Sequence, residues 1–179
     1  MKKACIFLAE GFEEVEAVTP LDLLRRRGID AKFISITGKK EVQGSHNITF
    51  LADELFENVN FDEFSAFILP GGMPGTKNLN AHTKLRELIL KKHSNGDLIC
   101  AICAAPTILD ELLITKDVKS TVYPTIELQN AIKTDDKVCV SNNIITANAL
   151  GSAIDFSLSI VEYMLSTDEK SSLKTEIVY

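Results

Sequence analysis

The sequence has no extended basic region. Its formal net charge is −6 and its pI is about 5.1, because 25 acidic residues outnumber 19 lysines and arginines. The basic runs are short: the longest is Arg25–Arg27, at the end of an expected helix where cations complement the helix dipole, and the others, such as Lys39–Lys40, are pairs. Proteins that bind nucleic acid or an anionic membrane surface need clustered lysine and arginine. The sequence therefore predicts neither a nucleic-acid partner nor a membrane partner.

Long hydrophobic runs are also missing. The apolar run Ala4–Ala9 stops at Glu10, short of the roughly 7 to 15 residues of a secretion signal. No other run approaches the length of a membrane span. The four cysteines are scattered among apolar positions and form no tight disulfide framework. We therefore expect a cytoplasmic protein with reduced cysteines.

The signatures of several enzyme classes are absent. The sequence contains no glycine-rich dinucleotide motif, no phosphate-binding P-loop and no Gly-X-Ser-X-Gly motif. The only histidines are His46, His82 and His93, and no pair of them has the spacing of a metal site. Glu13 and Glu14 are explained as water-exposed partners of a helix dipole. We expect neither a cofactor nor a metal.

The pattern of apolar residues predicts one α/β domain at residues 1–165, followed by a C-terminal tail at 166–179 that is loose or docked by its end. Short apolar runs suited to buried strands alternate with amphipathic helical patterns. Such alternation predicts a mainly parallel sheet with helices on both faces, a three-layer sandwich. The expected strands are 4–9, 31–37, 48–51, 66–69, 97–102, 118–123, 138–140 and 144–147, and the expected helices are 13–27, 83–93, 105–113 and 152–165.

Cys103 lies where the expected central strand turns into a helix. The small residues Ala104 and Ala105 follow it, and Pro106 suits the first turn of a helix. Such a strand-to-helix turn is a nucleophile elbow, which holds a reactive side chain at the end of a sheet. The helix that follows presents free N–H groups and the positive end of its dipole, which stabilise a thiolate. The sequence therefore predicts that Cys103 is a nucleophile.

Two other interpretations of this cysteine remain. Cysteine is among the most buried residue types, so a strand cysteine is commonly inert packing, as we expect for Cys100. Cys100 and Cys103 also match the Cys-X-X-Cys spacing of a redox pair. In an extended strand they would lie roughly 10 Å apart at about 3.3 Å per residue, whereas a disulfide needs Cα atoms within about 7 Å. We therefore favour a single nucleophile.

Candidate partners for the thiol follow two other strands, and the carboxyl ends of parallel strands meet at one edge of the sheet. Glu16 follows the first strand among apolar neighbours, so burial is expected to raise its pKa and keep it protonated beside a thiolate. Gly71 and Gly72 follow the third strand, and the N–H groups of Gly72 and Ala104 are candidate oxyanion donors. A simple turn explains the two glycines equally well.

Three segments together carry a resemblance to a known family: residues 9–16 (AEGFEEVE), 69–72 (LPGG) and 101–106 (AICAAP). In this order and spacing they resemble the ThiJ/PfpI superfamily, on the branch of the Parkinson-disease protein deglycase and its bacterial relatives. The similarity extends to residues 151–156. It implies a flavodoxin-like fold and a homodimer. It also implies Cys103 as an oxidation-prone nucleophile, Glu16 as its protonated partner, and Gly72 and Ala104 as oxyanion donors. We add Gly71 and Tyr123 as accessory candidates.

The resemblance further implies a cofactor-independent glyoxalase or deglycase acting on a small aldehyde, methylglyoxal, or on its adducts. Older labels for such proteins are thiazole monophosphate biosynthesis protein and intracellular protease. The alternative is an oxidative-stress sensor or chaperone in which Cys103 oxidises to a sulfinate without turnover.

Two departures from the family pattern bear on the chemistry. Many animal members have a histidine where this chain has Tyr123, so Glu16 and Tyr123 are left to manage protons. The usual Gly-Pro-Gly-Thr loop reads Ala-Leu-Gly-Ser at residues 149–152. The peptidase branch has a histidine directly after the nucleophile, and glutamine amidotransferases have a downstream His-X-Glu. Ala104 and the lack of any histidine after Cys103 argue against both.

Overall fold

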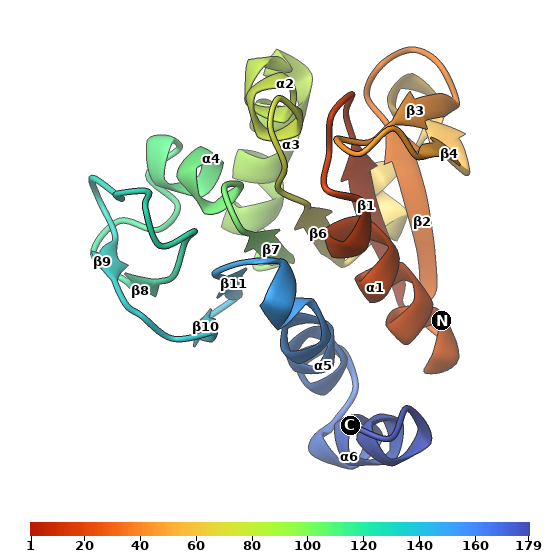
Figure 1. Ribbon diagram of the computed structural model, residues 1–179, viewed down its shortest axis with the longest axis vertical. Helices are drawn as coiled ribbons and strands as arrows, with labels where there is room; N and C mark the ends of the chain where they lie inside the picture. The colour runs from red at the N-terminus through yellow and green to blue at the C-terminus, as the bar shows by residue number, and fades with distance from the viewer.

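A seven-stranded sheet runs through the middle of the protein (Figure 1). The computed structural model describes the whole chain, residues 1–179. The strand order is β10-β11-β7-β6-β1-β2-β5, and all neighbours are parallel except β10, which pairs antiparallel with β11. The strands are β1 (Lys3–Leu8), β2 (Asp30–Ser35), β5 (Glu54–Leu55), β6 (Ala66–Leu69), β7 (Leu98–Ile102), β10 (Val138–Ser141) and β11 (Ile144–Ala147).

Helices cover both faces of this sheet, with α1 and α5 on one face and α2, α3 and α4 on the other (Figure 1). Strand β1 shows why: its even-numbered residues, such as Ile6, join the core under α1 and α5, and its odd-numbered residues, such as Phe7, join the opposite core. A strand that is apolar throughout must be covered on both faces. The predicted three-layer α/β fold is confirmed. The helices are α1 (Glu14–Arg26), α2 (Gly75–Ala81), α3 (Thr83–Ser94), α4 (Pro106–Glu111), α5 (Ala153–Met164) and α6 (Thr167–Glu176).

Smaller elements lie outside the main sheet. They are the antiparallel pair β3 (Glu41–Gln43) and β4 (Thr49–Leu51), the parallel pair β8 (Lys119–Ser120) and β9 (Ile132–Lys133), and 3₁₀ turns at Phe56–Asn58, Phe61–Glu63 and Leu150–Ser152. The strand expected at 118–123 is therefore only two residues long. From Thr121 onward its backbone bonds elsewhere, because the N–H of Thr121 donates to the Thr146 hydroxyl and that of Tyr123 to the Cys103 carbonyl.

The C-terminal segment is docked, which was one of the two expected alternatives, but it is a helix held along its length and not a loose chain held by its end. It forms helix α6, which begins at a Ser166 cap and packs on α5. Leu173 is fully buried in the core shared with α1 and α5, and Ile177 packs against the same core. Arg26 and Arg27, at the end of α1, form ion pairs with Glu176. One buried leucine in a polar stretch is too weak a pattern to predict a helix. None of the helices has both the length and the apolar character that crossing a membrane requires.

Candidate active site

Cys103 occupies the turn between β7 and α4, as the sequence predicts. Its φ of +63° lies in the left-handed region, where a non-glycine residue is strained. The turn is held by two backbone hydrogen bonds: Cys103 N–H donates to the Ala147 carbonyl at 2.9 Å, and the Cys103 carbonyl accepts from Tyr123 N–H at 2.8 Å. The side chain is half-buried, whereas Cys5, Cys100 and Cys139 are buried. The geometry is that of a nucleophile elbow, and Cys103 is the least buried of the four cysteines.

Glu16 reaches the elbow from the first turn of α1, at the carboxyl end of β1. Its side chain is fully buried, and Oε2 accepts a hydrogen bond of 2.9 Å from Gly71 N–H. The other oxygen, Oε1, is buried without a hydrogen-bond partner, and the group beside the carboxyl is the Cys103 thiol. The predicted pairing of Glu16 with Cys103 is therefore present in the fold.

Glu16 and Cys103 strongly affect each other's ionisation. Burial raises the pKa of Glu16 to about 7, against the opposing effect of the Gly71 hydrogen bond. Burial, together with the charge of an ionised Glu16, raises the pKa of Cys103 to about 12. Two anions in this space repel each other, so the pair retains at least one proton at neutral pH. A thiolate at Cys103 thus requires the proton on Glu16, which then becomes a hydrogen-bond donor to sulfur.

Two backbone N–H groups face the sulfur, and both belong to residues that the sequence singles out. The N–H groups of Gly72 and Ala104 lower the pKa of Cys103, and neither donates to a backbone carbonyl. Gly72 has a φ of +88°, and a Cβ there would lie 2.4 Å from Glu13 N. Helix α4 has only six residues, fewer than the expected 105–113, so the donors are these individual N–H groups rather than a long helix dipole.

Tyr123 contributes its backbone to this region. Its N–H holds the Cys103 carbonyl, while its side chain is 42% exposed. The Tyr123 hydroxyl makes no hydrogen bond to Cys103 or Glu16, so the structure does not bring the two expected proton-handling side chains together. No sequence motif predicts that the backbone of Tyr123 donates to Cys103.

A second group of ionisable side chains lies at the start of α1. Glu14 is 4% exposed, in contrast to the expected solvation, and accepts hydrogen bonds from the His46 backbone N–H at 2.6 Å and from the Ser45 hydroxyl at 3.2 Å. Its Oε2 also lies 2.9 Å from His46 Nδ1. Although burial opposes ionisation, the hydrogen bonds from His46 and Ser45 lower the pKa of Glu14 to about 2. The hydrogen bond with Glu14 raises the pKa of His46.

Glu13 joins this group, and one ligand atom each from Glu13, Glu14 and His46 lies within 4.8 Å of the others. Such a set could hold a metal ion, although the carboxylates and the imidazole already satisfy one another. Sequence reasoning missed the cluster because His46 is about thirty residues from the two glutamates and no short motif connects them.

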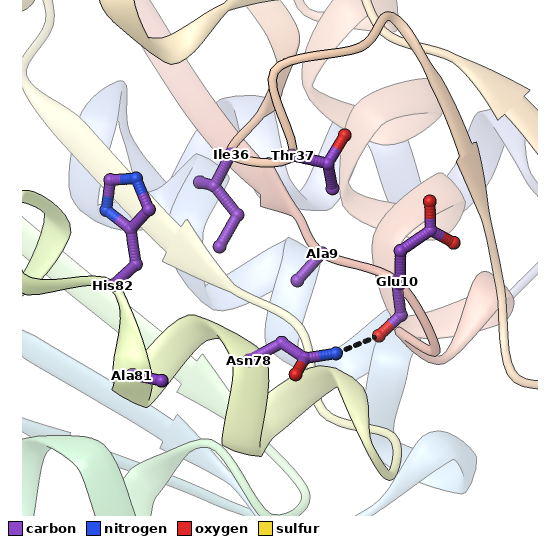
Figure 2. Close-up of a pocket in the computed structure, with 7 residues that line it drawn as sticks. All are labelled: Ala9, Glu10, Ile36, Thr37, Asn78, Ala81 and His82. Atoms are coloured by element: carbon purple, nitrogen blue, oxygen red, sulfur yellow. Dashed lines mark hydrogen bonds between the residues drawn. The ribbon is translucent and has the colours of Figure 1, made fainter.

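A separate pocket of about 370 Å³ lies beyond the ends of β1 and β2 (Figure 2). Figure 2 shows Glu10 on one side and His82 on the other, with Ile36 between them, and Asn78 Nδ2 donating to the Glu10 carbonyl at 2.8 Å. Neither Cys103 nor Glu16 lines this pocket. It belongs to the α2 and α3 side of the sheet, whereas Cys103 packs against the α1 and α5 side.

Comparison with known proteins agrees with this geometry. A family model described as DJ-1/PfpI family matches residues 2–163. Protein dj-1beta of Drosophila melanogaster is 35% identical over 165 residues, which cover 90% of this chain and 88% of the fly protein. Protein DJ-1 homolog B of Arabidopsis thaliana is 31% identical over 99% of this chain, which spans 41% of that longer protein. The structure of oxidized Toxoplasma gondii DJ-1 superposes with a TM-score of 0.96 at 29% identity, covering 100% of this chain and 99% of the other.

Proposed function

The chain belongs to the DJ-1/PfpI family, and we propose that it is a cysteine-dependent enzyme of the glyoxalase or deglycase type. Its substrate would be methylglyoxal or an adduct of methylglyoxal, and its reaction would need no cofactor. The observation that carries this proposal is the contact between a fully buried carboxyl group, Glu16, and a half-buried thiol, Cys103, at a strained strand-to-helix turn.

The first step is addition of the Cys103 sulfur to the aldehyde carbon of methylglyoxal. A carbon–sulfur bond forms, the carbonyl π bond opens, and the thiol proton ends on the new hydroxyl oxygen to give a hemithioacetal. The N–H groups of Gly72 and Ala104 face the sulfur, so they are placed to stabilise the alkoxide before it is protonated. This step uses the elbow and the two backbone donors.

The second step moves a proton between adjacent carbons. Glu16, as a carboxylate, removes the proton from the carbon bonded to sulfur, and the electron pair passes to the neighbouring carbonyl to give an enediolate. The acid form of Glu16 then returns that proton to the neighbouring carbon, while the hydroxyl proton on the carbon bonded to sulfur moves to the neighbouring oxygen, which leaves a thioester. A pKa near 7 suits a group that must both accept and donate a proton at neutral pH. Water hydrolyses the thioester to lactate and regenerates Cys103, so no external oxidant or reductant is needed.

Lactate formation from methylglyoxal without glutathione tests this proposal. We expect Cys103→Ser and Glu16→Gln to abolish turnover, and we expect Cys139→Ala, which alters another thiol, to retain it. Thermal denaturation checks that each variant is folded. Undiminished turnover in a folded Cys103→Ser variant would reject the mechanism.

We also propose that the chain acts as a homodimer in the cytoplasm. The dimer is supported by the family and by apolar side chains left exposed on α1 and near it, Val15 at 41%, Val18 at 38% and Ile48 at 53%. The compartment is supported by four free cysteines. Sedimentation velocity of the wild type and of a Val15→Glu/Val18→Glu variant tests the dimer, and a monomeric wild type would count against it.

Oxidation of Cys103 is a second candidate function, favoured by its partial exposure and by a relative of similar structure described as oxidized. Two equivalents of peroxide would convert the thiol to a sulfinate, which Glu16 would hold. Mass spectrometry after mild peroxide, paired with the lactate assay, separates the two functions. Selective oxidation of a protein that never turns over methylglyoxal favours the sensor.

A further inference from the structure

The peptide group that joins Cys103 to Ala104 is held at its carbonyl end by Tyr123. The Cys103 carbonyl accepts from Tyr123 N–H at 2.8 Å, and the Ala104 N–H at the other end of the same peptide faces the sulfur. A peptide bond is planar, so its C=O and N–H rotate together. Any rotation that breaks the bond from Tyr123 would therefore also turn the Ala104 N–H away from the sulfur.

Tyr123 lies in the connection between β8 and β9. This connection forms no β-sheet hydrogen bonds of its own, so other hydrogen bonds must hold it in place. One anchor is the bond from Thr121 N–H to Thr146 Oγ1, at 3.0 Å. The rest of the connection, residues 124–131, is exposed or half-buried. At its far end it leads into β9, where Ile132 N–H donates to the Val118 carbonyl at 2.9 Å, and a second anchor holds residues 129–131 just before that strand.

Asp110 supplies that second anchor. It lies on α4, the helix that begins directly after the elbow, and is 4% exposed. Its carboxylate accepts backbone N–H groups from Gln129 at 2.6 Å, Asn130 at 3.0 Å and Ala131 at 2.8 Å. The hydroxyl of Thr115 adds a fourth donor at 3.3 Å. The side-chain amide of Asn130 is a fifth donor at 3.5 Å, and five donors from the protein around one buried carboxylate form a rigid attachment.

We propose that Asp110 is a positioning residue for the oxyanion donor at Ala104. It anchors the connection that carries Tyr123, and Tyr123 in turn orients the Cys103–Ala104 peptide. Asp110 follows the elbow on α4, and the connection that it anchors contacts the elbow again through Tyr123. The inference deepens the proposed function, on which its relevance to turnover rests. Asparagine cannot replace Asp110, because its NH₂ group would face backbone N–H donors instead of accepting from them.

Asp110→Asn tests the proposal, with Glu111→Gln as the matched control on the same helix. Glu111 has a 56% exposed side chain that contacts only Asn80 and Arg86. Hydrogen exchange at the Tyr123 amide and the pH dependence of Cys103 alkylation by iodoacetamide are measured without any aldehyde. We expect Asp110→Asn to speed exchange at least about tenfold. It should also move the alkylation midpoint to higher pH, because the Ala104 N–H stabilises the thiolate. Glu111→Gln should change neither.

Unchanged exchange and alkylation in folded Asp110→Asn would overturn the proposal. Should that variant fail to fold, Thr115→Val removes a single donor to Asp110, and smaller shifts in the same direction are expected. If the wild type produces lactate, Asp110→Asn should lower kcat by roughly tenfold with little change in KM. Losing a whole oxyanion donor lowers kcat by about 10²–10³, and a misplaced donor should cost less than that. If Asp110→Asn speeds exchange at the Tyr123 amide but keeps the wild-type kcat, the proposal is also overturned. An inactive wild type would reject the proposed function and leave the alkylation result to decide the positioning role.

Discussion

Gly71 and Cys103 approach each other so closely that no side chain fits between them. A Cβ built on Gly71 would lie 2.7 Å from the Cys103 Cβ and 2.6 Å from Glu16 Oε2. Gly71, in the loop after β6, therefore separates the Glu16 carboxyl group from the Cys103 thiol and sets the distance between them. Its N–H also donates to the carboxyl group.

We expect Gly71→Ala to lower kcat/KM for methylglyoxal by about tenfold to a hundredfold, because a displacement of about 1 Å at reacting groups can cost that much. Gly151→Ala is the matched control. Gly151 has nothing within 4 Å of an added Cβ and no positive φ. Steady-state kinetics of the two variants provide the comparison. Equal activity would show that the carboxyl–thiol spacing does not control the reaction.

Turnover should rise with pH through a midpoint near 7. Removal of the substrate proton requires Glu16 as a carboxylate, and burial raises its pKa to about 7, so the active form accumulates above that pH. Lactate formation measured from pH 5 to pH 9 at methylglyoxal concentrations well below KM gives the profile of kcat/KM, which reports the pKa of the free enzyme. A midpoint near the ordinary carboxyl value of 4.5 would contradict a role for this buried group.

Glu16 should also make the fold less stable as pH rises. Its pKa is 4.5 in its ordinary state and about 7 in the fold, so the stability is full below pH 4.5 and is lost progressively up to about pH 7. The loss amounts to about 3 kcal/mol, at roughly 1.4 kcal/mol per pKa unit. Relative to wild type, Glu16→Gln should therefore gain stability between pH 5 and pH 8. Urea denaturation at both values measures the difference, and parallel curves for the two proteins would refute it.

Leu173 should stabilise the whole domain. We expect Leu173→Ala to cost about 2–4 kcal/mol, because it leaves a cavity in the core shared by α1, α5 and α6. Val178→Ala, at a position that is 94% exposed, should change stability by no more than about 0.5 kcal/mol. Chemical denaturation compares the two. A negligible effect of Leu173→Ala would mean that α6 is peripheral to the fold.

The parts of the fold and the site that follow from local patterns could be predicted from the sequence. Strand β6 lies where the apolar run 66–69 places it, and β1 and β7 differ from the expected strands by a residue or so. Three strand ends then bring Glu16, Gly71 and Cys103 to one edge, as a parallel sheet requires. Glu16 is buried, as expected, but its apolar neighbours Val15 and Val18 are exposed. Its burial therefore follows from its place on the inner face of α1 and not from those neighbours.

The parts that depend on distant partners could not be predicted. Glu14 was expected to be solvated, but the β3–β4 hairpin brings His46 and Ser45 onto it. Helix α2 has a single fully buried leucine, Leu79, and no clear periodicity. The anchoring of residues 129–131 by Asp110 joins segments about twenty residues apart through backbone N–H groups, which leave no mark on the side-chain pattern.

The burial of Cys5, Cys100 and Cys139 leaves Cys103 as a natural single-site reporter. A maleimide mass tag should add once per folded chain, and any compound that binds over Cys103 should slow that labelling. Candidate ligands can therefore be screened by their protection of Cys103 from labelling. This assay also detects compounds that bind but are not turned over.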